Sequence, residues 1–157
     1  MIFETQSGKR PKMPVYYNIS PELKIVYIIC AGLVTAQELF EVVELSSFDF
    51  RRESGMDTVI DLLASELDFD LPDMYRSISY LDELPDDGAG HERQILVTPS
   101  KSLYLLVDAI YSISTKNTLE LKVVSTLQDA ILSLRLSDQQ QEAMQFFEGN
   151  KNSIRHA

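Results

Sequence analysis

The apolar run IVYIICAGLV at residues 25 to 34, followed directly by TAQE, most constrains what this chain can fold into. The run is too short to span a bilayer, so we interpret it as a buried strand. In TAQE, Thr35 and Glu38 have the spacing of a capping box, which predicts a helix from there to about Ser47. A buried strand leading directly into a capped helix is typical of an α/β protein.

Other segments repeat this pattern along the chain. VYYNIS at 15 to 20 alternates polar and apolar residues and predicts an antiparallel partner for the strand at 25 to 34. Further strands are predicted at 56 to 64, 93 to 100 and 119 to 125, and further helices at 71 to 84, at 102 to 114 and after the cap at Thr126. Because right-handed crossovers make the later strands parallel, we expect a mixed sheet of about five strands flanked by helices.

The length of 157 residues favours a single domain, which we place at residues 15 to 136. Residues 1 to 14 are interpreted as a flexible lead-in and residues 149 to 157 as a disordered tail. An extra helix is predicted at 137 to 148. Its Met144, Phe146 and Phe147 need cover from the chain's own sheet or from another subunit, and we predict that the helix helps to form a homodimer.

The net charge of −10 is concentrated in one segment. Residues 57 to 92 hold eleven acids and one base, Arg76, and the rest of the chain is balanced. Nucleic acid and anionic membrane are bound through clustered Lys and Arg, so this pattern excludes them as partners. A protein partner with a basic surface is the expectation that the charge supports.

Residues that carry chemistry are sparse. The single cysteine, Cys30, lies inside the apolar run, so we interpret it as a core residue of a cytoplasmic protein and not as a nucleophile. His91 and His156 have no Ser or Cys nearby in a pattern that would activate a nucleophile, and the chain contains no phosphate-binding or metalloprotease motif. We therefore expect no catalytic residues, no metal and no cofactor.

The acidic stretch LDFDLPDM at 67 to 74 is the strongest candidate site. If a helix starts at Leu71, Asp70 is its N-cap and Asp73 lies three residues later, so capping explains both side chains. Asp68 is not explained by the cap. The alternatives that stay open are a contact with a partner and a metal or general-base site.

Two other places could hold a functional group. Asp61 lies within or just after a strand, where α/β proteins place ligands, but for a lone carboxylate we expect a bond to neighbouring loop amides. Ser100, Lys101 and Ser102 follow a strand and open a helix, so they could contact an anion or ligand. Simple capping by Ser100 is the alternative.

Residues 15 to 136 resemble the SpoIIAA-like branch of the STAS fold, the domain of anti-sigma-factor antagonists. The resemblance rests on VYYNISPELKIVYIICAGLVTAQEL, TVIDLL, ILVTPSKSLYLLVDAIYSI and LQDAILSL. It implies a mixed sheet flanked by helices, in proteins that mostly bind other proteins or small ligands. The phosphorylated serine of that family would fall at Asp70 or Leu71, and the nearest serine upstream is Ser65, so no phosphorylation is predicted there.

Three functions follow as hypotheses. The first is a non-enzymatic regulatory or interaction module, which binds a basic partner through Asp61, Asp68, Asp70 and Asp73. The second is a module that binds a small apolar or lipid-like ligand between the sheet and the Tyr- and Leu-rich helix at 102 to 114. The third, which we rank lowest, is a hydrolase that uses Asp61 with Asp68 or Asp70.

Overall fold

The structure is a computed structural model that describes residues 14–73, 75–76, 79, 92–113, 119–136 and 138–155. The predicted lead-in lies outside the described residues, except for Pro14. Most of the helix predicted at 71 to 84 lies outside them as well, although the described residues between 71 and 79 are helical.

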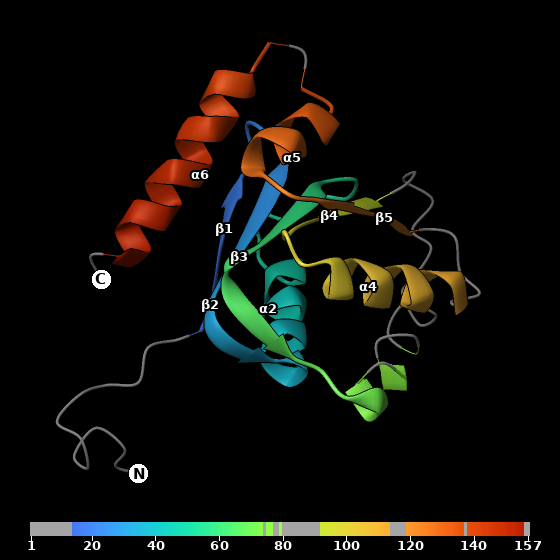
Figure 1. Ribbon diagram of the computed structural model, residues 1–157. Coiled ribbons are helices and arrows are strands. Elements are labelled where there is room, and N and C mark those ends of the chain that lie inside the picture. Colours follow the sequence, from blue (N-terminus) through green and yellow to red (C-terminus); the bar gives the residue numbers. More distant parts are fainter. Residues whose placement is uncertain are drawn as a thin grey trace, which may run out of the picture.

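A five-stranded mixed sheet forms the centre of the molecule (Figure 1). Its strands are β1 (Val15–Ser20), β2 (Ile25–Thr35), β3 (Asp57–Asp68), β4 (Glu92–Val97) and β5 (Leu119–Val124), and they lie side by side in that order. The first pair is antiparallel, with Val15 opposite Cys30, and the other three pairs are parallel. The predicted fold class is confirmed, including the antiparallel pair before the parallel strands.

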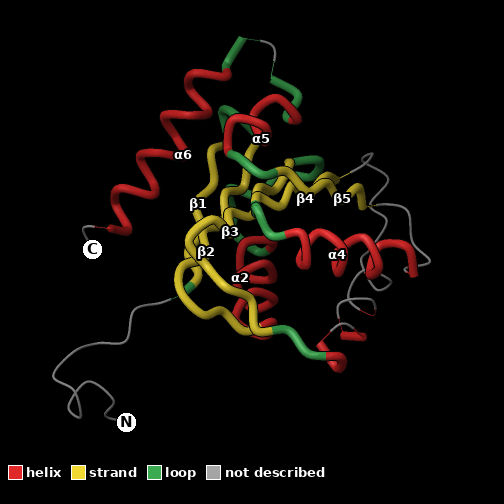
Figure 2. The backbone as a smooth tube through the Cα atoms, viewed as in Figure 1, coloured by secondary structure: helices red, strands yellow, loops and turns green. Residues whose placement is uncertain are grey.

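Helices cover both faces of the sheet, as the tube in Figure 2 also shows. They are α2 (Ala36–Ser47), α4 (Lys101–Ile113), α5 (Leu127–Ser133) and α6 (Gln140–Arg155). Sequential strands joined by crossovers of one hand place their connecting helices on one face. Accordingly α2 and α4 pack on the same side, and the opposite face is covered by α5 and α6, which follow the last strand.

Each face of the sheet has its own hydrophobic cluster, because successive side chains of a strand point to opposite sides. In β2, Val26 and Ile28 belong to the cluster under α2 and α4, whereas Tyr27 and Ile29 belong to the cluster under α5 and α6. A strand that is buried on both faces has no polar alternation, which accounts for the continuous apolar run in the sequence.

The helix starts follow the predicted caps. Thr35 and Glu38 form a complete capping box, in which each side chain accepts from the backbone N–H of the other. Ser100 Oγ accepts from the N–H of Leu103, and Thr126 Oγ1 accepts from the N–H of Asp129. These caps are local, so the sequence alone was enough to locate them.

The C-terminal helix differs from the prediction in its extent. It extends to Arg155, so most of the segment that we interpreted as a disordered tail is helical. Of the two kinds of cover that were predicted for its apolar residues, the structure shows the chain's own sheet, because Ala143 and Phe147 are fully buried in the cluster on that side. The homodimer stays a prediction.

Candidate functional site

A bulge in β3 changes the course of the sheet immediately after Asp61. The pairing of β2 with β3 moves from Ile29 opposite Asp61 to Ala31 opposite Ala64, so β3 contains one extra residue at that point. The pairing between β3 and β4 ends at Asp61, opposite Val97. Beyond the bulge, β2 and β3 continue together as a two-stranded extension, residues 31 to 35 and 64 to 68, which we call the acidic ribbon.

The acidic ribbon has one inward and one outward face. Val34 is buried, Leu67 packs against the core under α2 and α4, and the ring of Phe69 meets the ring of Phe40 with centroids 6.3 Å apart. Gly32 has φ +74°, a left-handed conformation that favours glycine. The inward side chains therefore hold the ribbon in place, and among the described residues its outward side chains are exposed.

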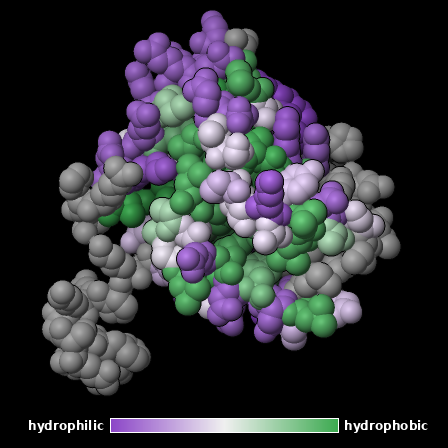
Figure 3. Space-filling model, in the orientation of Figure 1, coloured by the Kyte–Doolittle hydropathy of each residue, from purple (hydrophilic) through white to green (hydrophobic). Residues whose placement is uncertain are grey.

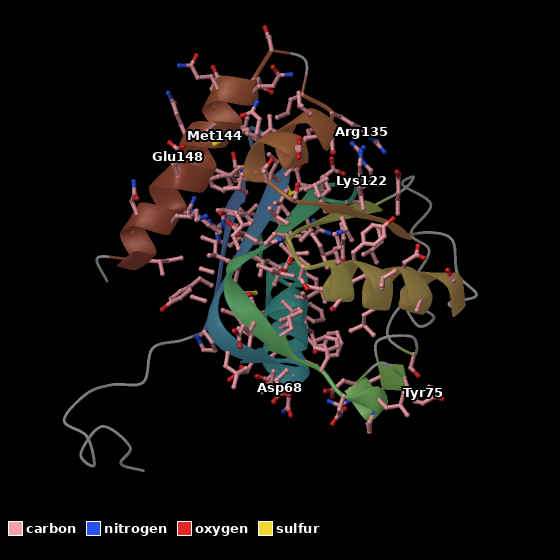
Figure 4. The ribbon with its side chains drawn as sticks, in the orientation of Figure 1. Asp68, Tyr75, Lys122, Arg135, Met144 and Glu148 are labelled. Carbon is pink, nitrogen blue, oxygen red and sulfur yellow. The ribbon has the colours of Figure 1, made fainter. Side chains whose placement is uncertain are left out.

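The outward face combines an apolar side chain with carboxylates. Leu33 is 64% exposed and lies opposite Glu66, and Thr35 lies opposite Asp68. Glu66 and Asp68 are exposed. Figure 3 shows hydrophobic residues on the part of the sheet that α6 does not cover, and Figure 4 shows Asp68 at the end of the ribbon farthest from α6. Residues 31 to 35 and 64 to 68 include no Lys or Arg, so the charge of this face is negative.

Asp70 and Asp73 form a reciprocal cap at the start of the following helix. The N–H of Asp73 donates to Asp70 Oδ1 at 2.9 Å, and the N–H of Asp70 donates to Asp73 Oδ2 at 3.0 Å. Asp73 also forms an ion pair with Arg76 at 3.5 Å. The capping interpretation is confirmed for both residues, and Asp68 lies outside this cap, two residues before Asp70 at the end of β3.

Asp61 occupies a different place from the other three aspartates. It is 1% exposed, on the side of the sheet that α6 covers. Its Oδ2 accepts from the hydroxyl of Tyr27 at 2.6 Å and lies 3.2 Å from Lys151 Nζ, and its Oδ1 accepts from the N–H of Leu63 at 3.0 Å. This position corrects the inclusion of Asp61 in the acidic face. The expected bond to a nearby amide is present, and its donor belongs to the bulge.

The proposed pairing of Asp61 with Asp68 or Asp70 for hydrolysis is not supported by the geometry. Asp68 is seven residues farther along β3, which corresponds to roughly 20 Å of extended chain. One of these carboxylates is buried and the other is exposed. Glycosidic hydrolysis, for example, needs two carboxyl groups within about 10 Å of each other.

Lys151 and Tyr27, the two side-chain partners of Asp61, were not predicted from the sequence. They come from α6 and β2 and are far from Asp61 in the sequence. A second polar contact holds the same helix, since Asn18 Nδ2 donates to Asn150 Oδ1 at 2.9 Å. A signal was present in TVIDLL, because an acid among buried apolar residues requires a buried partner.

The Asn18 contact is part of a polar chain around the edge of the sheet. Arg51 donates to Asn18 Oδ1 at 2.8 Å and makes two bonds to the carboxylate of Asp49, which also accepts from the Tyr17 hydroxyl. The side-chain bonds from Arg51 hold the pKa of Asp49 well below its usual range. This network fixes the turn after α2 against β1.

The predicted anion-contact residues border two hollows at the carboxyl ends of the strands. Lys101 lines a hollow of about 630 Å³ between α4, β5 and α5, which also contains Lys122 and Asp129. Ser102 lines a second hollow of about 320 Å³ between β3 and α4. Ser100 lines both, and its hydroxyl accepts from the N–H of Leu103 as the N-cap of α4.

The groups with potential chemistry in the core are not activated. Burial raises the pKa of the Cys30 thiol to about 12, with a further contribution from the charge of Asp61. Burial also raises the pKa of Tyr27, and Asp61 adds to that shift. Both groups are protonated at neutral pH. Among the described residues, no group of three His, Cys, Asp or Glu side chains is placed to hold a metal ion, and no helix is long and apolar enough to cross a membrane.

Neither a family model nor a curated protein matches the chain. Among solved structures, the chain is similar to an uncharacterised protein of the DUF3478 family from Shewanella loihica PV-4, which has a SpoIIAA-like fold. The sequences are 12% identical, the TM-score is 0.49, and the match covers 76% of this chain and 93% of that chain. At this identity the likeness concerns the fold alone.

Proposed function

We propose that this chain is a non-enzymatic protein-interaction module, which binds a basic partner through the outward face of the acidic ribbon. The observation that carries the proposal is the exposure of Leu33 opposite Glu66, with Asp68 two residues farther along the same strand, on a ribbon that extends past the end of β4. An apolar centre with a polar rim is the usual composition of a protein interface.

The chemistry of the ribbon defines the partner. Leu33 would contact an apolar side chain, and Glu66 and Asp68 would face Lys or Arg on the partner. Charges at the rim of an interface act mainly on the rate of association and on specificity. Binding should therefore weaken as salt rises, because exposed charges are screened over about 10 Å at 0.1 M salt.

The test compares capture of proteins from the native cell extract by the immobilised full-length chain and its variants, at low and at moderate salt. Leu33→Ser, Glu66→Gln and Asp68→Asn should each lose the same captured protein, whereas Glu44→Gln, which removes an exposed acid on α2, should retain it. The captured protein should also be released as salt rises. Equal capture by all of these variants would refute the proposal.

A second candidate is supported by the smaller hollow. Its walls are Leu62, Leu67 and Phe69 from the β3 side and Leu103 and Leu106 from α4, with serines at its margin. Such a lining suits a small ligand that is mainly apolar and has one polar end. Native mass spectrometry of the purified chain would detect a retained ligand, and Leu106→Gln should abolish its retention.

A further inference from the structure

The carboxylate of Asp61 joins the C-terminal helix to the bulge from which the acidic ribbon begins. One oxygen, Oδ2, contacts Lys151 of α6 and the Tyr27 hydroxyl. The other oxygen, Oδ1, accepts from the N–H of Leu63 inside the bulge. A second side chain also bonds to the backbone of the bulge: Ser65 Oγ donates to the carbonyl of Leu62 at 3.2 Å. Backbone groups that the extra residue removes from the ladder are thus bonded by neighbouring side chains.

Lys151 of α6 is the cation that pairs with the buried Asp61 carboxylate. The Asp61 side chain is almost fully buried, and the Lys151 side chain that pairs with it is 21% exposed. A buried carboxylate without a cation is strongly destabilising, so withdrawal of Lys151 favours a state in which water reaches the carboxylate. The bulge is the nearest place to open, because Leu63 and Ala64 are exposed.

We infer that α6 controls the shape of the acidic ribbon through Asp61. Docking of α6 on the sheet and formation of the bond from the Leu63 N–H to Asp61 are then cooperative. When Lys151 is in place, Asp61 stays buried and holds the Leu63 amide. When Lys151 is withdrawn, Asp61 turns toward water, the amide loses its acceptor and the ribbon changes its course. The consequence for partner binding rests on the proposed function, whereas the coupling itself is measured without a partner.

Residue-resolved hydrogen exchange on the full chain tests the coupling. Lys151→Gln should raise the exchange rate of the Leu63 amide by about tenfold or more, because the variant leaves Asp61 without its cation. The double variant Asp61→Asn with Lys151→Gln should restore protection, since asparagine keeps an acceptor for Leu63 and carries no charge. Asn150→Ala is the control: it removes the other polar anchor of α6 and should leave the Leu63 amide within about twofold.

The inference is overturned if Lys151→Gln accelerates exchange in α6 and not at Leu63, or if Asn150→Ala affects Leu63 as strongly. Should Lys151→Gln fail to fold, the double variant must fold and protect Leu63, and its failure would also overturn the inference. Capture of the basic partner should be lost with Lys151→Gln and regained in the double variant. If ribbon substitutions leave capture unchanged while Leu63 responds as expected, the proposed function fails and the coupling stands.

Discussion

At the scale of the residue, the aspartates of this chain have separate roles that their surroundings assign. Asp70 is exposed and accepts from a helix amide, whereas Asp61 is buried and needs a lysine, a tyrosine and an amide. Asp68 is exposed at the end of β3 and lies on the face that we assign to a partner. Three aspartates within ten residues of sequence therefore have three roles: Asp70 is a helix cap, Asp61 is a buried anchor and Asp68 is a surface charge.

Replacing Asp70 by alanine should cost on the order of 1 kcal/mol of unfolding free energy, because the N–H of Asp73 loses its acceptor. Asp70→Asn and Asp70→Ser keep an acceptor and should cost much less. Urea unfolding monitored by circular dichroism measures the difference. Asp68→Ala is the matched control, since Asp68 is exposed and lies outside the cap, and an equal loss there would contradict the assignment of the cap to Asp70.

At the scale of the element, α6 shows how tertiary contacts can stabilise a sequence with weak helical propensity. The segment GNKNS at 149 to 153 contains residues that favour turns and ends of helices. It is helical because Asn150 bonds to Asn18, Lys151 pairs with Asp61, and Phe147 is buried one turn earlier. The prediction of a disordered tail was wrong for residues 149 to 155 because it weighed local propensity alone.

Phe147→Ala should lower the unfolding free energy by about 3–5 kcal/mol, because it leaves a cavity against Tyr27, whose ring centroid lies 4.5 Å from that of Phe147. Gln145→Ala on the exposed side of the same helix should change it by less than about 0.5 kcal/mol. Guanidinium unfolding of both variants provides the comparison. Similar effects of the two substitutions would show that α6 is not part of the cooperative core.

At the scale of the whole molecule, the topology explains why α5 and α6 are needed. The helices α2 and α4 pack on one face of the sheet, and the opposite face carries Tyr27, Val59, Ile95 and Val97. These side chains would be exposed without helices that follow the last strand. Asp61 lies on the side of the sheet covered by α5 and α6. Its charge adds to the effect of burial in raising the pKa of both Cys30 and Tyr27.

Stability should fall in alkali because burial, with a smaller contribution from Asp61, raises the pKa of Cys30. The pKa of Cys30 is about 12 in the folded chain against 9.0 as its ordinary value, so above pH 9 the unfolded state loses a proton that the folded state retains. This contribution is fully present below pH 9 and is lost as the pH rises towards 12. Between pH 8 and pH 10.5 the unfolding free energy should fall by about 2 kcal/mol through Cys30 alone.

Urea unfolding at those two pH values measures the alkaline loss, and Cys30→Ala should lose less than the natural chain. The raised pKa of Tyr27 acts in the same direction and remains in the variant, so a smaller decrease should persist there. An identical loss in both chains would show that the Cys30 thiol does not contribute.

The amino-acid sequence by itself determined the elements whose signals are local. Branched apolar runs define the strands, and the caps at Thr35, Asp70, Ser100 and Thr126 mark where helices begin, because each cap joins residues three apart in the chain. Only the tertiary structure decided the bulge at Asp61, the exposed face of the acidic ribbon and the docking of α6. The contacts of Asp61 with Tyr27 and Lys151 join residues that are far apart in the chain, and such long-range pairing leaves no periodic pattern in the sequence.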